Sequence, residues 1–154
     1  MRLAPAAAAA LALLAAGCQL GPRPVATLPP SGDWAVVSMQ AGDRALRDPQ
    51  AALARQGQVL SFEPDRAVSG PHSCGNPRYL ANLMVADRYL RGELGLRHHD
   101  LGLYRYQDVR ITEVYCGGRK WRPLGGVVLW VSDTLGFAVA DGVVYELRRV
   151  APTR

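Results

Sequence analysis

Two apolar runs separated by Asp141-Gly142 constrain the fold of this chain more than any other feature of its sequence. The runs are Leu135 to Ala140 and Val143 to Arg149. Asp-Gly between two such runs is a strong signal for a two-residue β-hairpin turn, in which both central residues have positive φ. We expect this hairpin to close a barrel. On its second strand, the interior face is predicted to comprise Val143, Tyr145 and Leu147, and the solvent face Val144, Glu146 and Arg148.

Short strand-like runs with turn residues between them extend this pattern upstream. We expect strands at residues 34–39, 59–63, 109–116 and 127–131, and a short helix from Asp48-Pro49 to Arg55. Residues 76–96 fit either a helix that begins at Asn76-Pro77 or a strand, and we favour the strand. Its inner face would comprise Tyr79, Ala81, Leu83 and Val85. The repeated short strands predict a mainly β domain, a small antiparallel β-barrel or meander with one or two short helices.

The first 17 residues predict a secretory signal peptide. Met1-Arg2 precedes an apolar run from Leu3 to Ala16, which is too short for a bilayer-spanning helix of roughly 20 residues. The sequence Leu14-Ala-Ala-Gly-Cys18 resembles a bacterial lipobox, the site at which Cys is lipidated before cleavage. We therefore expect Cys18 to carry the lipid. The alternative is a secreted protein without an anchor.

Residues 18–32 are predicted to be a tether between the lipid and the folded domain. The segment contains four prolines, which disfavour a helix or a central strand. The folded domain is then residues 33–150. Gln19 follows Cys18 in place of the Asp that commonly retains lipoprotein in the inner membrane, so we favour the periplasmic face of the outer membrane.

The cysteine count favours a structural disulfide. With Cys18 lipidated, Cys74 and Cys116 remain as a pair in an oxidising compartment. The alternative is a catalytic thiol at Cys74 with His72 as its base, since both would share one face of a strand. This alternative leaves Cys116 without a role, and we favour the disulfide.

The charge pattern identifies a candidate partner-binding surface and argues against nucleic acid. The chain has 18 basic and 13 acidic residues, but the basic residues are spread along it without a run. The candidate surface combines cations with an aromatic ring and comprises Arg119, Lys120, Trp121 and Arg122. The alternative is a solvated hairpin tip with Trp121 tucked under the barrel.

The sequence contains no motif that predicts an enzyme, a cofactor or a metal. It contains no phosphate-binding glycine motif and no nucleophile elbow, and its four Glu suggest no catalytic carboxylate pair. The motif His98-His99-Asp100, with His72, is the one metal-like group. Adjacent histidines in a strand point to opposite faces, so we expect a solvated loop there.

Several short motifs resemble those of META-type domains, small β-rich domains of bacterial envelope lipoproteins and heat-shock-associated proteins. The matching elements are Gly32-Asp-Trp34, Leu60-Ser-Phe62 with Gly70, Cys74-Gly-Asn76 with Tyr79, a second Cys, and Asp141-Gly142 with Leu147-Arg148. The resemblance covers most of residues 32–149. It implies a non-enzymatic envelope protein and assigns no catalytic residue. A lipocalin-like or inhibitor-type barrel is an equal alternative.

Three functions are consistent with these patterns. The first is a structural or stress-related lipoprotein that binds a protein or peptidoglycan partner in the periplasm. The second is an inhibitor of an exported hydrolase such as lysozyme, acting through a projecting loop. The third is a carrier of a small apolar ligand, which requires an apolar cavity inside the barrel.

Overall fold

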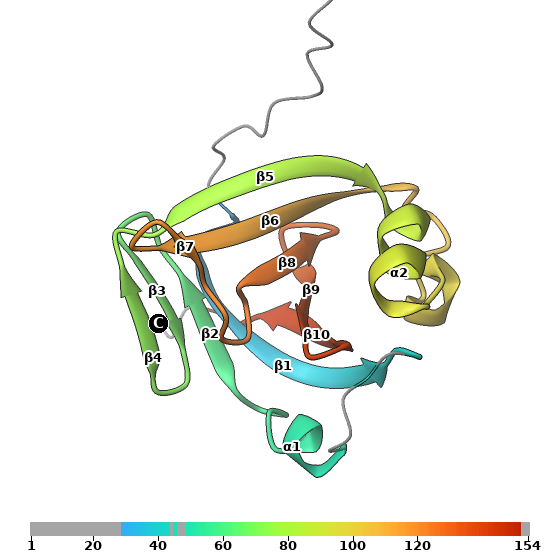
Figure 1. Ribbon diagram of the computed structural model, residues 1–154, viewed down its shortest axis with the longest axis horizontal. Coiled ribbons are helices and arrows are strands. Elements are labelled where there is room, and N and C mark those ends of the chain that lie inside the picture. Colours follow the sequence, from blue (N-terminus) through green and yellow to red (C-terminus); the bar gives the residue numbers. More distant parts are fainter. Residues whose placement is uncertain (1–28, 44, 46–48, 152–154) are drawn as a thin grey trace, which may run out of the picture.

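The computed structural model describes residues 29–43, 45 and 49–151 (Figure 1). The predicted signal peptide, Cys18 and most of the tether lie outside the described residues. The strands are β1 (Gly32–Ala41), β2 (Val59–Phe62), β3 (Arg66–Ser69), β4 (His72–Gly75), β5 (Arg78–Val85), β6 (Asp108–Cys116), β7 (Arg119–Lys120), β8 (Val127–Trp130), β9 (Leu135–Ala140) and β10 (Val143–Arg149). The helices are α1 (Pro49–Leu53), α2 (Ala86–Leu94) and the 3-10 helix η1 (His98–Leu101).

The strands form one antiparallel sheet that curls into a half-barrel, which confirms the predicted fold class (Figure 1). The strand order is β4-β3-β2-β1-β10-β9-β8-β6-β5, and β7 pairs with β6 off this path. Strands β4 and β5 are therefore the two ends of the path, although they follow one another in the chain.

The C-terminal hairpin forms as predicted, but its place in the sheet differs from the prediction. Strands β9 and β10 pair in the register Val143 to Ala140, and Asp141 and Gly142 have φ of 54° and 76°. However, β10 also pairs with β1, so the hairpin joins two halves of the sheet and lies in the middle of the path. It therefore cannot close the barrel, because the opening lies between β4 and β5.

Aromatic rings fill the concave side of the sheet. The ring centroids of Trp34 and Trp130 lie 4.7 Å apart, and Phe62 meets Trp130 edge to face at 5.6 Å. The indole Nε1 of Trp130 donates to Oγ1 of buried Thr112 at 3.1 Å, so this polar atom is satisfied inside the core. The predicted inner residues Val143, Tyr145 and Leu147 belong to the same core.

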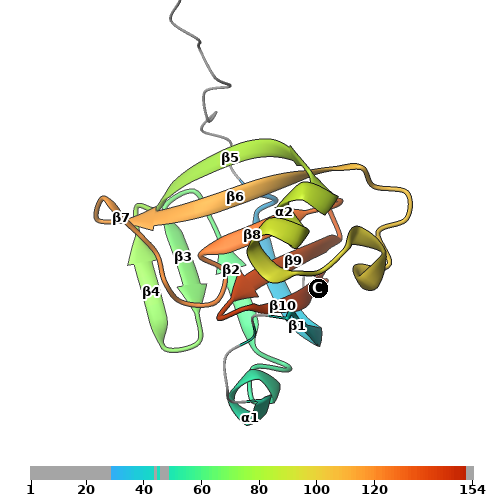
Figure 2. The same ribbon diagram turned by 45° about the vertical axis from the view of Figure 1, so that its right-hand side comes forward.

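A second core lies on the convex side of the sheet, under α2. Leu90 and Leu94 of α2 are buried in one cluster with Leu129, Phe137 and Val144. Figure 2 shows α2 in front of β8 and β9. This cluster corrects the expected polar face of β10: Val144 is buried, whereas Glu146 and Arg148 pair with each other at 2.7 Å.

The first half of the segment 76–96 is the favoured strand, and a helix follows it that begins at Ala86 and not at Asn76-Pro77. These elements are β5 and α2. On β5, Tyr79 and Ala81 are buried as expected, but Leu83 and Val85 are 74% and 46% exposed. The expected inner face is therefore wrong for these two residues, since β5 extends past the filled part of the half-barrel.

We predict that Gly142→Val lowers the free energy of unfolding by about 1–3 kcal/mol, because a β-branched residue is strained at positive φ. Gly75→Val is the matched control, since the φ of Gly75 is not positive and its Cβ would meet no atom within 4 Å. Thermal melts of both variants test the prediction. Equal melting temperatures for the two would contradict it.

Candidate functional site

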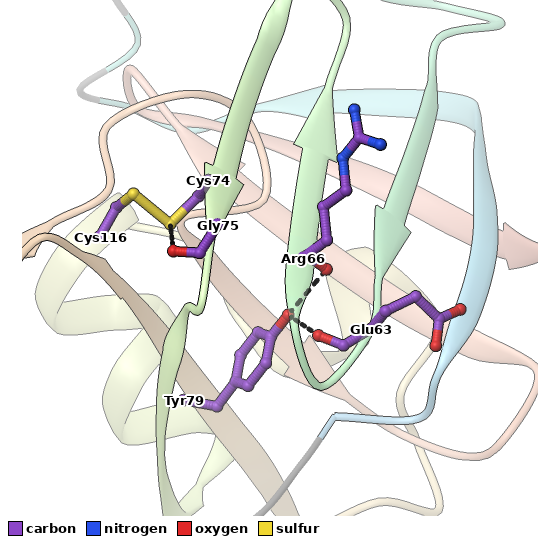
Figure 3. The surroundings of a disulfide bond; sticks show 6 residues. All are labelled: Glu63, Arg66, Cys74, Gly75, Tyr79 and Cys116. Atoms are coloured by element: carbon purple, nitrogen blue, oxygen red, sulfur yellow. Dashed lines mark hydrogen bonds between the residues drawn. A yellow bond between two sulfur atoms is a disulfide. The ribbon is translucent and has the colours of Figure 1, made fainter.

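The predicted cysteine pair lies where the sheet would otherwise open. Cys74 in β4 and Cys116 at the end of β6 form a disulfide with a Cα–Cα distance of 5.7 Å (Figure 3). Strand β4 is one end of the strand path, and β6 is next to the other end. The bond therefore ties the β4 edge of the half-barrel to β6, the strand next to the other edge. A paired and buried Cys74 also leaves no free thiol for the catalytic alternative.

Tyr79 adds a second tie across the same opening. Its hydroxyl donates to the carbonyl oxygen of Glu63 at 2.8 Å and lies 3.4 Å from that of Arg66, in the turn between β2 and β3 (Figure 3). Burial, with the nearby Glu63 carboxylate, raises the pKa of Tyr79 to about 12. The hydroxyl therefore keeps its proton at physiological pH and can act as the donor.

We predict that reduction of the disulfide lowers the free energy of unfolding by about 4 kcal/mol, because 42 residues separate the two cysteines. Tyr79→Phe should cost about 1 kcal/mol, since one buried hydrogen bond is lost. Urea unfolding of a Cys18→Ser protein with and without reductant measures the first effect, and urea unfolding of Tyr79→Phe in the same background measures the second. An unchanged urea midpoint after reduction would contradict the role assigned to the disulfide.

The candidate partner-binding surface comprises β7 and the start of the loop between β7 and β8, beside the last residues of β6. Strand β7 pairs with the last residues of β6, and the chain then turns through Pro123 to β8. Gly126 is needed here, because a Cβ at this position would lie 1.9 Å from the carbonyl oxygen of Trp121. The loop therefore has a fixed path back to the sheet.

The four predicted residues of this surface have different environments. Lys120 forms an ion pair with Glu113. Arg119 and Arg122 are exposed, and neither side chain has an ion pair or hydrogen bond within the described part of the chain. These two guanidinium groups are the charges that remain open to a partner.

Trp121 does not project from the surface, which corrects the expectation that it contacts a partner directly. It is 9% exposed and belongs to the concave core. Its backbone N–H donates to the carbonyl oxygen of Val114 at 2.8 Å. Its apolar ring anchors the loop, as in the alternative of a ring tucked under the barrel.

The loop forms one wall of a surface groove with a volume of about 380 Å³. We call it the β7–β8 groove; it is lined by Lys120, Trp121, Arg122, Pro123, Gly126, Val127, Val139 and Asp141. The sequence did not indicate that Val139 and Asp141 also line this groove, because both residues are far from the loop in the chain. Asp141 is paired with Arg55 at 3.1 Å, so Arg122 is the one unpaired charge among these lining residues.

The histidine motif is part of the α2–η1 region. His98 Nδ1 lies 2.9 Å from Asp87 Oδ1, and hydrogen bonds from His98 lower the pKa of the Asp87 carboxyl. His99 lies 3.5 Å from Asp100. Among the described residues, no group of three or more His, Cys, Asp or Glu side chains could hold a metal ion.

Comparisons with protein-family models, curated proteins and solved structures found no match to this chain. The resemblance to META-type domains and the lipobox thus stay predictions. Among the described residues, no helix is long and apolar enough to cross a membrane.

Proposed function

We propose that this chain is a non-enzymatic lipoprotein of the bacterial envelope that binds an anionic partner, peptidoglycan or protein, at the β7–β8 groove. The lipid on Cys18 would hold it on the outer membrane, facing the periplasm. The observation that carries the proposal is the exposed, unpaired guanidinium group of Arg122, which lines this groove, with that of Arg119, which precedes the lining residue Lys120 in β7.

The groove has the features of a binding site for an anionic group. The loop that presents the arginines is anchored by buried Trp121 and by the pairing of β7 with β6, so their backbone is ordered before a partner binds. Arginine suits carboxylates because its planar donors can make two parallel hydrogen bonds. Val127 and Val139 add apolar contact area to the lining of the groove.

Packing inside the half-barrel favours this outer surface over the carrier alternative. Trp34, Phe62 and Trp130 occupy the concave side, where a carrier would hold an apolar ligand. A partner on the outer groove leaves this core intact.

We predict that Cys18→Ser abolishes lipid attachment, because the thiol is the lipidated group in the lipobox interpretation. Expression in a bacterial host with labelled palmitate, followed by membrane fractionation, measures this. The wild-type chain should carry label in the outer-membrane fraction. Label and the same fractionation in the Cys18→Ser protein would show that the anchor lies elsewhere.

We predict that Arg119→Glu/Arg122→Glu weakens co-sedimentation with purified cell-wall sacculi about tenfold, equivalent to about 1.4 kcal/mol. The attraction should also fall as salt increases, since both charges are exposed. The matched control is Arg88→Glu/Arg105→Glu, with the same charge change at exposed positions outside the groove.

Equal losses in the two double variants would mean that net charge, and not the groove, determines binding. Undiminished binding in both would reject the surface. If the wild-type chain ignores sacculi but inhibits lysozyme in a turbidity assay, the inhibitor alternative replaces a cell-wall partner.

A further inference from the structure

Strand β5 forms one end of the sheet, and no described strand lies beyond it (Figure 1). Its other edge pairs with β6 in an unbroken register. The N–H of Ala86 donates to the carbonyl oxygen of Gln107 at 2.8 Å, and these two residues continue that register. Because backbone groups point alternately to the two sides of a strand, the even-numbered residues of β5 bond to β6. The odd-numbered residues therefore direct their N–H and C=O groups to the open edge.

The open part of this edge runs from Ala81 to Val85. Before it, the buried ring of Tyr79 is held by its hydrogen bond to the turn between β2 and β3, and after it α2 begins at Ala86. Within it, Leu83 is 74% exposed and Val85 is 46% exposed. No described residue outside β6 accepts a hydrogen bond from the backbone N–H of Leu83 or Val85. This stretch is thus an unused strand edge with apolar side chains in solvent.

The composition of this stretch does not prevent a further strand from pairing with it. Proteins usually protect an exposed edge with a charged side chain, a proline, a bulge or a very short strand. The sequence Ala-Asn-Leu-Met-Val at 81–85 has no charge and no proline, and its register with β6 has no bulge. The opposite end of the sheet differs, since β4 has only four residues and is held by the disulfide of Cys74. The open edge of β5 is therefore suited to the addition of a strand.

We propose that this edge pairs with the same edge of a second copy of the chain, with the two β5 strands antiparallel. Leu83 is the midpoint of the open stretch, so pairing over its full length places Leu83 opposite the same residue of the other copy. Ala81 of each copy then lies opposite Val85 of the other. Such a contact is two-fold symmetric and uses the same edge of both copies, so it closes as a dimer and leaves no open edge on β5.

The charges around the edge favour self-pairing. On β6, Arg110 lies opposite Leu83 and Asp108 lies opposite Val85. Neighbouring strands are about 4.8 Å apart, so the Arg110 residues of two copies would be about 14 Å apart, beyond the Debye length of about 8 Å at physiological salt. Self-pairing therefore brings no like charges together. It places the two exposed Leu83 side chains next to each other on one face of the joined sheet, whereas a charged partner strand would find no ion pair on this edge.

The dimer should be weak. The five residues 81–85 of each copy pair, whereas a standard interface has roughly 20–30 residues on each side. We therefore expect reversible association in the high micromolar range, with monomer and dimer in equilibrium. The β7–β8 groove contains no residue of β5, so the inference does not depend on the groove having a partner.

The first test is sedimentation equilibrium of the full chain with Cys18→Ser, in a density-matched neutral detergent. The protein mass should rise from monomer to dimer as the concentration increases. Leu83→Lys should weaken dimerisation at least about tenfold, because two positive charges would face each other across the pair. The matched control is Val59→Lys, with the same charge change at a 47% exposed position of the inner strand β2, and it should leave dimerisation unchanged. Thermal melts verify that each variant folds.

The second test is a cross-link that depends on the register. In the same background, Leu83→Cys under mild oxidation should give a disulfide-linked dimer on a non-reducing gel. Opposite residues of a hydrogen-bonded antiparallel pair have Cα atoms about 5.5 Å apart, which is within the range that a disulfide spans. Val59→Cys is the matched control, and it should cross-link several-fold less.

Four outcomes would overturn the inference. The first is a chain that stays monomeric up to millimolar concentration. The second is equal dimerisation of the Leu83→Lys and Val59→Lys proteins, which would place the contact elsewhere. The third is cross-linking of Leu83→Cys no greater than that of Val59→Cys. The fourth is dimerisation only after deletion of residues 19–28, which would assign the edge to the N-terminal segment of the same chain.

Discussion

The structure depends on how the two edges of one curled sheet are joined. Strands β4 and β5 are consecutive in the chain, yet they are the opposite ends of the strand path, so no backbone ladder in that path closes the half-barrel. Two side-chain ties bridge the edges: the Cys74–Cys116 disulfide, and the hydrogen bond from the Tyr79 hydroxyl to the turn after β2. A small β domain with open edges is prone to edge-to-edge association, so these ties preserve the barrel shape and protect the edges.

Both faces of the sheet are used for packing, and this explains where binding surfaces remain. The concave side holds the indole and phenyl rings, and α2 covers the convex side of β8, β9 and β10. The β7–β8 groove lies instead where the loop between β7 and β8 meets the end of β9. Loops carry charged and polar side chains at little cost to the core, which is why binding sites concentrate there.

Local sequence signals predicted the local structure well. The Asp141-Gly142 turn and the strands around it follow from residue preferences that act within short segments. The cysteine pairing follows from a count: with Cys18 predicted to carry the lipid, two cysteines remain. Leu83 was assigned to the wrong environment, and the sequence left the burial of Trp121 open between two alternatives, since burial depends on how far each strand extends and on what packs across from it. Arg55 carried no signal at all. It pairs with Asp141 and lies over the ring of Tyr145, both more than 80 residues away, so only the folded chain brings these groups together.

The indole of Trp34 donates to the carbonyl oxygen of Pro30, which fixes the start of the described chain at one end of the β9–β10 hairpin. Pro30 shares a pocket with Asp133, just before β9, whereas Asp141, just after β9, lines the groove at the other end. A six-residue strand is about 20 Å long. The start of the described chain and the end of β9 that borders the groove are thus separated by the length of this strand. The groove therefore lies at the end of the hairpin opposite the end where the described chain begins.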